Sequence, residues 1–323
     1  MSNPDMKRYI DVGEKLEMKE ETTIQTTDAT EFEIPGDEAL DQIKRHTELK
    51  IMWYNFKKNR NAVIGLIITI FLLSIAIFAD VISPYSPIDQ TQNLLTSPST
   101  EHIFGTDALG RDMLSRVIHG SRISIGVGFG AVGISLVIGL TLGIAGGYFG
   151  GNVDAIVTMV IDMFMSFPGL LLAMVIASLL GPTLPNVMIA VGIGQFTLFA
   201  RLVRSSVYLE KEKEYILAAR SVGSSNLLII FRHIIPNIFS TVIIITTVNI
   251  GSAILMTASL GFLGLGAQPP LAEWGNMVNI GRGYIQIAPW LIWFPGIAII
   301  LSVLGANLLG DGLRDALDPK LRK

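Results

Sequence analysis

The side chains that could carry out chemistry are sparse in this sequence, and their spacing suits neither a metal site nor a nucleophilic one. There is no cysteine, which excludes a thiolate metal site, a disulfide and a cysteine nucleophile. No two histidines stand at metal-ligand spacing with a carboxylate partner; the four are His46, His102, His119 and His233. The glycines, including those of GRGYI (Gly281–Ile285), do not form the Gly-Lys-Ser/Thr phosphate loop. We therefore expect no catalytic, metal or cofactor site, and no ATP hydrolysis by this chain alone.

Two further polar features need an interpretation. Asp162 lies about two turns inside an apolar run, where a carboxylate costs roughly 2.5–3.5 kcal/mol on insertion scales. It should therefore face other helices or water; a proton or cation relay is one interpretation, but we favour helix packing or a position near the surface. LGRDMLSR (Leu109–Arg116) has no buried base beside it, and we expect a short outer helix whose polar face contacts a substrate-delivering partner.

The composition is that of a membrane protein. Of the 323 residues 50% are hydrophobic and 16% charged, with a mean hydropathy of +0.53, whereas a soluble domain is about a quarter charged. Residues 1–50 hold 13 of the 27 acids and 7 of the 24 basic residues, a net charge of −6. The first apolar run begins only near Asn61, after a long polar segment, so we expect a retained span and no signal peptide.

Six apolar runs are long enough to cross a bilayer. A helical span needs about 20 residues because the hydrocarbon core is roughly 30 Å thick, and lipid offers the backbone no hydrogen bonds. The runs are continuous and not alternating, which predicts an all-α polytopic protein. We expect spans at 62–79, within 123–153, from near 154 to a Pro/Gly turn at 181–186, at 187–203, within 238–266 and within 289–310.

Lysine and arginine residues indicate the orientation, because cytoplasmic loops carry an excess of them. An even number of spans places the basic groups before the first span, between the fourth and fifth, and after the sixth on one face, which should be cytoplasmic. Both termini are then cytoplasmic. The groups are Lys57, Lys58 and Arg60; Arg201, Arg204, Lys211, Lys213, Arg220 and Arg232; and Arg314, Lys320, Arg322 and Lys323.

The opening residues 1–49 differ from the rest of the chain. They are acidic and poor in aromatic residues, so they cannot bury enough apolar area to offset the entropy of ordering. We expect a cytoplasmic and largely disordered extension. Trp53, Tyr54 and Phe56 should begin the ordered part, as an interfacial helix beside two lysines.

A charged and glycine-broken segment, residues 211–236, separates the fourth and fifth runs. Lys211–Ser221 is predicted to be a short helix, with Tyr215, Ala218, Ala219 and Val222 on one face at i, i+3, i+4 and i+7. Gly223 should end it, Ser224 or Ser225 should cap a second helix at Asn226–Ile235, and Pro236 should mark the return to the membrane. The physical alternative is an amphipathic connector that lies on the lipid surface.

AARSVG followed by IIPN (218–223 and 234–237) resembles the coupling motif of ABC-importer permeases, in which Glu-Ala-Ala is followed by a glycine and later by a hydrophobic-Pro pair. Leu217 stands at the position of the motif's glutamate, and His233 replaces a usual apolar residue. Three longer blocks, at Phe104–Gly128, Ala258–Met277 and Gly310–Arg322, resemble the C-type subunit of oligopeptide and dipeptide permeases.

That resemblance implies a type I ABC-importer permease architecture with a cytoplasmic coupling helix. It implies a pore-forming subunit in a bacterial inner membrane, with a homologous second permease, two cytoplasmic ATP-binding subunits and an extracytoplasmic binding protein that delivers peptides. ATP hydrolysis would belong to the partners. The ATPase-coupling residues would be Tyr215, Ala218, Ala219, Val222, Gly223 and Pro236. The chain would divide into the extension at 1–49, a first span and outer loop at 50–122, and a permease core at 123–323.

Other interpretations stay open at this point. The same architecture could carry nickel or another small solute. A secondary transporter or a membrane assembly factor belongs to a different class, which is disfavoured because ionisable residues are almost absent from the spans. Family members often carry an arginine between the two acids of the third span, where this chain has Met159, and an acid where it has Thr257. We therefore doubt an intramembrane ion pair involving Asp154 or Asp162.

Overall fold

The structure, a computed structural model, describes residues 53, 54 and 56–317. The predictions for residues 1–49 and for the basic residues after 317 lie outside this part of the chain. Residues 53, 54 and 56–58 are helical, as expected, and Lys57 Nζ lies 4.9 Å from the ring centroid of Trp53. The helices are α3 (Arg60–Ile77), α4 (Ala79–Ile82), α5 (Met113–Phe149), α6 (Gly151–Met165), α7 (Gly169–Leu180), α8 (Leu184–Lys211), α9 (Glu214–Ser221), α10 (Asn226–Ile229), the π-helix η1 (Ile230–Ile234), α11 (Ile235–Phe262), α12 (Trp274–Gly281), the 3-10 helix η2 (Arg282–Tyr284) and α13 (Trp290–Leu317).

Five of the six predicted spans are continuous helices, and in place of the third the structure has a bent pair of helices. Within the described residues, α3, α5, α8, the stretch Asn226–Phe262 and α13 are each long and apolar enough to cross a membrane, and α6 with α7 makes a sixth if the two are counted as one span. The axes of α6 and α7 meet at 85°. Pro168 explains the break, because it lacks an N–H group and forces the residue before it out of the helical region.

The second span begins earlier than predicted, because α5 starts at Met113. Asp112 caps this helix, and its Oδ2 accepts a hydrogen bond of 2.8 Å from the N–H of Ser115. The expected separate outer helix at Leu109–Arg116 is therefore wrong. Gly110, at φ +71°, makes a turn, and the residues after Asp112 form the first turn of α5.

The central contact of the bundle joins α5 and α8. Gly143 and Gly147 of α5 face α8 so closely that a Cβ on either would lie 2.7 Å from an α8 atom, the Cβ of Val203 or the carbonyl oxygen of Arg204. Side chains could not be accommodated there without separating the helices. Small residues thus allow the close backbone approach on which van der Waals packing between membrane helices depends.

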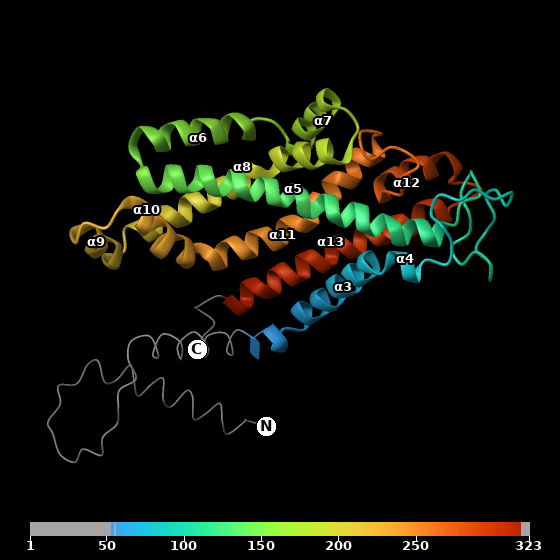
Figure 1. The fold of residues 1–323 in the computed structure, drawn as a ribbon, viewed down its shortest axis with the longest axis horizontal. Coiled ribbons are helices and arrows are strands. Elements are labelled where there is room, and N and C mark those ends of the chain that lie inside the picture. The colour runs from blue at the N-terminus through green and yellow to red at the C-terminus, as the bar shows by residue number, and fades with distance from the viewer. Residues whose placement is uncertain (1–52, 55, 318–323) are drawn as a thin grey trace, which may run out of the picture. The chain divides into compact units, whose positions relative to one another are not determined.

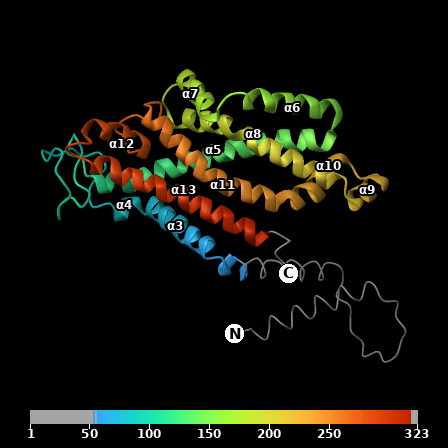
Figure 2. The same ribbon diagram turned by 180° about the vertical axis from the view of Figure 1, so that it is seen from behind.

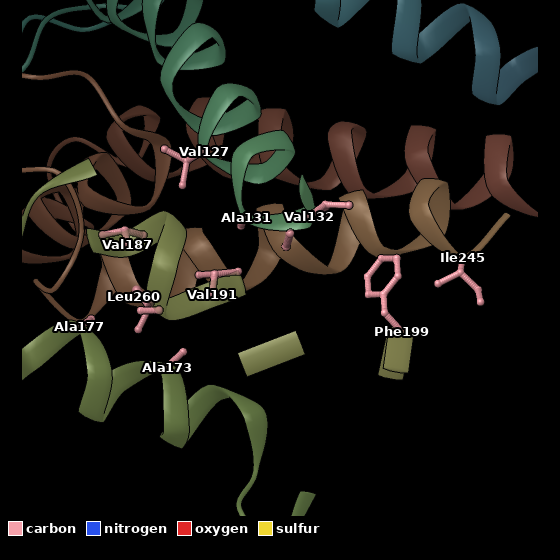
Figure 3. Close-up of a cluster of buried hydrophobic side chains, with 12 residues drawn as sticks. Val127, Ala131, Val132, Ala173, Ala177, Val187, Val191, Phe199, Ile245 and Leu260 are labelled. Atoms are coloured by element: carbon pink, nitrogen blue, oxygen red, sulfur yellow. The ribbon is translucent and has the colours of Figure 1, made fainter. Parts of the chain in front are cut away.

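A core of small and branched side chains joins α5, α7, α8 and α11 (Figure 3). Phe199 of α8 is its one large aromatic member and is completely buried. The core therefore joins one helix that precedes the broken span in sequence (α5), one half of that span (α7) and two helices that follow it (α8 and α11). The members labelled in the figure are Val127, Ala131, Val132, Ala173, Ala177, Val187, Val191, Phe199, Ile245 and Leu260.

The bundle has two different ends (Figures 1 and 2). At one end lie α9, α10 and the turn between α5 and α6. At the other end lie α12 and the long loop between α4 and α5. This arrangement follows from the alternating direction of successive spans, and it places the segment predicted to couple to an ATPase at one extremity of the molecule.

Candidate functional site

The end of the bundle opposite α12 carries a short helix–turn–helix, which we call the ledge: α9, the turn Val222–Ser225 and α10. It begins three residues later than predicted, because Lys211 is the last residue of α8. Ile216 anchors α9 and is completely buried. It belongs to an apolar cluster with Val203 and Val207 of α8, Tyr148 of α5, and Ile229, Ile230 and Ile234.

The turn after α9 has the geometry that the sequence predicted. Gly223 adopts φ +82°, its N–H donates to the carbonyl of Arg220 at 3.0 Å, and the N–H of Ser224 donates to the carbonyl of Ala219 at 3.1 Å. These two bonds form a Schellman motif, which satisfies carbonyls at the end of a helix. Ser225 then caps α10, because its Oγ accepts from the N–H of Leu228 at 3.3 Å.

The structure divides the helix face that was predicted to hold Tyr215, Ala218, Ala219 and Val222 together. Val222 is 82% exposed and Ala218 is also exposed, whereas Ala219 turns partly inward and packs on the apolar cluster below α9. Tyr215 is 39% exposed. Sequence reasoning missed four exposed apolar side chains that extend the surface along the ledge and η1: Leu217, Leu227, Leu228 and Phe231. A repeat at i, i+4 connects Leu227 to Phe231 and was the available signal.

A buried carboxylate ties the ledge to the fourth span. Glu210, in the last turn of α8, is 7% exposed; its Oε2 pairs with Lys213 Nζ at 2.9 Å, and its Oε1 accepts from the hydroxyl of Tyr215. Burial, with Glu210 beside it, raises the pKa of Tyr215 above the ordinary value, so the hydroxyl remains a donor at neutral pH. Neither contact was predicted, because Glu210 looks like one charge of a solvated run.

A second tie comes from the end of α5. The hydroxyl of Tyr148 donates to Oδ1 of Asn226 at 2.8 Å, and the guanidinium carbon of Arg220 lies 5.1 Å from the centroid of the Tyr148 ring. Tyr148 therefore contacts both helices of the ledge. Together with Glu210 it holds α9 and α10 in one arrangement relative to two spans.

The second helix does not end at Ile235 as predicted, because it continues through Pro236 into the fifth span. The chain is helical without interruption from Asn226 to Phe262, with a π-helical turn just before the proline. Pro236 has no N–H and its ring would clash with a carbonyl four residues earlier. The wider turn accommodates this: the N–H of Ile235 bonds the carbonyl of Ile230, and Asn237 Nδ2 donates to the carbonyl of His233 at 2.6 Å.

Ion pairs join α6 to α8, where we had doubted them. Arg204 Nη2 contacts Asp154 Oδ2 at 2.6 Å, and Arg201 Nη2 contacts Asp162 Oδ1 at 2.8 Å. The arginines come from α8, so an arginine within the third span is not needed. The predicted fourth span ends at residue 203 and so excludes Arg204, whereas α8 continues to Lys211.

The opposite end of the bundle holds buried charges that the sequence did not indicate. Asp107 pairs with Arg111 at 2.7 Å and lies 3.5 Å from Arg116, and His102 Nδ1 lies 2.9 Å from Asp112 Oδ1. All five side chains are at most 6% exposed. They fix the outer loop against the start of α5, so this end presents a rigid surface.

Glu273 is a further buried group at this end. It is 1% exposed and caps α12, with Oε1 accepting from the N–H of Gly275 at 2.8 Å and Oε2 from the N–H of Asn276 at 2.7 Å. Ser124 Oγ lies 3.4 Å from Oε1. Burial raises the pKa of Glu273, and the three hydrogen bonds partly oppose that shift.

Comparison with known proteins identifies the family. Residues 135–323 match the model of the binding-protein-dependent transport system inner membrane component, and residues 47–98 match the N-terminal TM domain of oligopeptide transport permease C. The dipeptide transport system permease protein DppC of Alkalihalophilus pseudofirmus is 48% identical over 267 residues, 82% of this chain and 88% of the relative. The glutathione transport system permease protein GsiD of Escherichia coli is 44% identical over 284 residues, 87% of this chain and 93% of the relative.

A solved structure has the same fold. The MetNI methionine ABC transporter, in an inward-facing conformation, contains a chain that superposes with a TM-score of 0.53 at 18% identity and covers 64% of this chain and 98% of its own length. The family match across more than half of the chain, together with relatives 44–48% identical over more than four-fifths of it, shows that this chain belongs to the inner-membrane components of binding-protein-dependent transport systems, the permease subunits of ABC importers.

Proposed function

We propose that this chain is the pore-forming subunit of an ATP-driven importer of peptides, and that the ledge is the surface through which the ATPase drives it. Relatives named for dipeptide, di/tripeptide and glutathione transport support the peptide cargo. The chain would act beside a homologous permease, above two cytoplasmic ATP-binding subunits and below an extracytoplasmic binding protein. The basic ends of the spans support placing the ledge and both termini in the cytoplasm.

One observation carries the coupling role. The ledge exposes an apolar strip, including Leu217 and Val222, at the extremity of the bundle, while Ile216 is fully buried beneath it. An exposed apolar strip with a rigid base is what a groove on a soluble partner would bind. A helix that merely lay on lipid would not need the Glu210 and Tyr148 contacts that hold the ledge to two spans.

The continuous helix after the ledge supplies a route for movement. The segment Asn226–Phe262 leads from the turn of the ledge into the bundle core without a break. A displacement of α10 would therefore be transmitted along the axis of α11, because a helix resists compression better than a loop does. The coupling residues are Tyr215, Ala218, Val222 and Gly223 at the surface, with Ala219 in the supporting layer and Pro236 within the lever.

The decisive test is reconstitution in vesicles of the complete importer, with both permeases, the two ATP-binding subunits and the binding protein. We expect ATP-dependent uptake of labelled di- and oligopeptides that requires the binding protein, and no ATP hydrolysis by the purified chain alone. Loss of ATPase capture by ledge variants, with the complex of the two permeases intact, would support the coupling role.

The peptide assignment and the coupling assignment would be contradicted by different results. Uptake of nickel or another small solute but of no peptide would contradict the peptide assignment and leave the ledge untouched. Full ATPase binding and uptake after substitution of the exposed ledge residues would contradict the coupling assignment and leave the cargo untouched.

A further inference from the structure

A cavity of about 320 Å³ lies between α3, α5, α11 and α13, and no residue of the ledge lines it. Its walls are almost entirely apolar, with Leu73 of α3, Phe129 of α5, Ile250 of α11 and Ala306 of α13 among them. Protein interiors are packed so closely that voids larger than a water molecule are few. Apolar cavities of about half this volume stay dry and bind small hydrocarbons. A space of this size and lining therefore requires an occupant.

The depth of the cavity can be measured along α3, which carries no charged residue after Arg60. Asp80 of α4, at the end of the bundle with the long loop, forms an exposed ion pair of 3.1 Å with Arg122 and marks the other edge of the apolar stretch (Figure 1). Thr69 in the cavity wall lies nine residues after Arg60 and eight before Ile77, or about 13 and 12 Å at ~1.5 Å per residue. The hydrocarbon core is roughly 30 Å thick, so the cavity lies near its middle.

The cavity cannot close by a simple approach of α3, because α3 and α13 are already in the closest contact that helices allow. A Cβ on Gly65 of α3 would lie 2.5 Å from the backbone nitrogen of Leu309 in α13. A Cβ on Gly305 of α13 would lie 2.8 Å from the side chain of Ile68 in α3. Movement of α3 towards α5 and α11 would break these contacts, on which the packing of membrane helices depends.

One end of the cavity is closed and one side is open. Towards the long loop, Arg122 Nε of α5 donates to the carbonyl of Ala76 in α3 at 3.0 Å, and Ala76 and Ile125 belong to one buried apolar cluster. Below this closure, two residues of the cavity wall reach the surface: Ile70 of α3 is 53% exposed and Phe129 of α5 is 44% exposed. The cavity therefore opens between α3 and α5, on the side of this closure that faces the end with the ledge.

Water does not suit this cavity. The hydroxyl of Thr247 donates to the carbonyl of Ile243 at 2.9 Å and that of Ser302 to the carbonyl of Ala298 at 2.8 Å, each within its own helix. The buried Oγ1 of Thr69 has no hydrogen-bond partner among the described residues. A buried water needs two to four polar partners, and one free hydroxyl group does not supply them.

A helix of a partner subunit does not fit either. A helix with its side chains is roughly 10 Å across, and one that crosses the ~30 Å of hydrocarbon occupies about 2,400 Å³, several times the volume of the cavity. An acyl chain is narrower than any helix and is the apolar molecule present at this depth of a bilayer. We propose that the cavity binds one acyl chain of a phospholipid from the leaflet on the side of the ledge, as a retained lipid between α3 and the rest of the bundle.

Photolabelling of the complete importer tests this site. The importer is placed in nanodiscs of phosphatidylethanolamine and phosphatidylglycerol that contain a phosphatidylglycerol with a diazirine near the end of one acyl chain. After illumination, mass spectrometry locates the lipid adducts. Ile125 and Ile254 line the cavity and are only 6% and 3% exposed, so ordinary surface lipid does not reach them. Val191, fully buried outside the cavity, gives the background, and Ile300, 64% exposed, reports on surface lipid.

Two substitutions fill the cavity, and a third is their matched control. Thr247→Phe and Ala306→Phe each place a ring in the cavity from a different helix, α11 or α13. Leu304→Phe adds a ring on α13 at a residue that is 44% exposed and is not part of the cavity wall. Co-purification of all subunits checks that each variant assembles.

We expect adducts at Ile125 and Ile254 of the native chain to exceed those at Val191 by about tenfold or more. They should fall by about fivefold or more in Thr247→Phe and Ala306→Phe and stay at the native level in Leu304→Phe, while the adducts at Ile300 stay constant throughout. Native mass spectrometry in detergent should find one retained phospholipid fewer on the two filled variants.

Adducts at Ile125 and Ile254 no more abundant than those at Val191 would overturn the inference and indicate that side chains of a partner subunit fill the cavity. Undiminished adducts in both filled variants would overturn it as well. The comparison within the native chain decides the matter even if neither filled variant assembles. Because the lipid site does not depend on cargo or coupling, background labelling in an importer that takes up peptide would refute the site alone.

Discussion

The hydroxyl of Tyr215, at the start of α9, donates a hydrogen bond to Oε1 of Glu210, in the last turn of α8. Glu210 is buried and also pairs with Lys213, so one carboxylate fixes the angle at which the ledge leaves the fourth span. Tyr215→Phe keeps the ring and removes only this bond. We expect a loss of about 1.5–3 kcal/mol in the free energy of unfolding, as for a bond to a charged acceptor, and slower uptake because the ledge is held less firmly.

Thermal unfolding of the purified complex and peptide uptake would measure the two effects of Tyr215→Phe. Tyr208→Phe is the matched control, because Tyr208 is exposed on the same end of α8 and is not a partner of Glu210. Equal behaviour of the two variants would contradict a positioning role for the Tyr215 hydroxyl.

Gly223→Ala tests the turn of the ledge. A Cβ at Gly223 would meet no atom within 4 Å, so the expected penalty, roughly 1–2 kcal/mol, comes from the positive φ alone. Gly264 offers a close control: it has the same φ of +82° and the same open surroundings, but lies in the loop after α11 at the other end. Both alanine variants should lower the melting temperature alike, while only Gly223→Ala should weaken capture of the ATPase in a pull-down.

Asparagine at position 223 adds a further check, since it tolerates the left-handed region better than alanine does. Gly223→Asn should retain more ATPase binding than Gly223→Ala. Loss of ATPase binding in Gly264→Ala as well would show that general destabilisation, and not the turn of the ledge, is responsible.

The division of the α9 face predicts opposite signatures for two neighbouring substitutions. Val222→Asp places a charge on a side chain that is 82% exposed, so stability should be unchanged while ATPase binding falls by tenfold or more. Ala219→Leu adds volume beneath the ledge, where Ala219 packs on the Ile216 cluster, and should cost roughly 1–3 kcal/mol of stability by overpacking. Melting temperature and ATPase affinity, measured side by side, distinguish them. A Val222→Asp variant that binds the ATPase normally would remove this residue from the contact surface.

Glu273 predicts a pH dependence at the opposite end. Because burial raises its pKa in the folded state, the folded protein holds the proton more tightly than the unfolded chain does. Its contribution to stability is then complete below the ordinary glutamate pKa of about 4.3 and is lost as the pH rises through the folded-state value. The native protein should therefore gain stability, relative to Glu273→Gln, as the pH is lowered from neutral towards that range.

Thermal unfolding at several pH values compares the two proteins. Glu273→Gln keeps a side-chain acceptor for the cap of α12, so its stability at neutral pH should be close to native. Glu273→Ala leaves the buried N–H groups of Gly275 and Asn276 without partners and should cost about 1–3 kcal/mol at neutral pH. Parallel pH profiles for the native protein and Glu273→Gln would exclude titration of this carboxyl.

Local sequence signals were sufficient for much of the fold and for the turn of the ledge. Apolar runs of span length predict helices because the bilayer leaves the backbone no other way to satisfy its hydrogen bonds. Gly223 predicts the end of α9 because glycine, which has no Cβ, adopts a positive φ without steric cost. Ser225 predicts the start of α10 because its side-chain oxygen can accept a hydrogen bond from a backbone N–H in the first turn of the helix. Both effects depend only on neighbouring residues in the sequence.

Contacts between residues distant in sequence were decided only by the tertiary structure. The pairs Asp162–Arg201 and Tyr148–Asn226 join residues 39 and 78 positions apart, and no periodicity within one helix indicates which charge or hydroxyl on another will meet it. Ala218 and Ala219 are chemically identical, yet only packing against α8 and η1 turns one inward and leaves the other exposed. The continuation of the helix through Pro236 was hidden for a related reason: a proline predicts a break from its own covalent geometry, whereas the π-turn that absorbs it depends on how Ile230 and Ile234 are buried beneath the ledge.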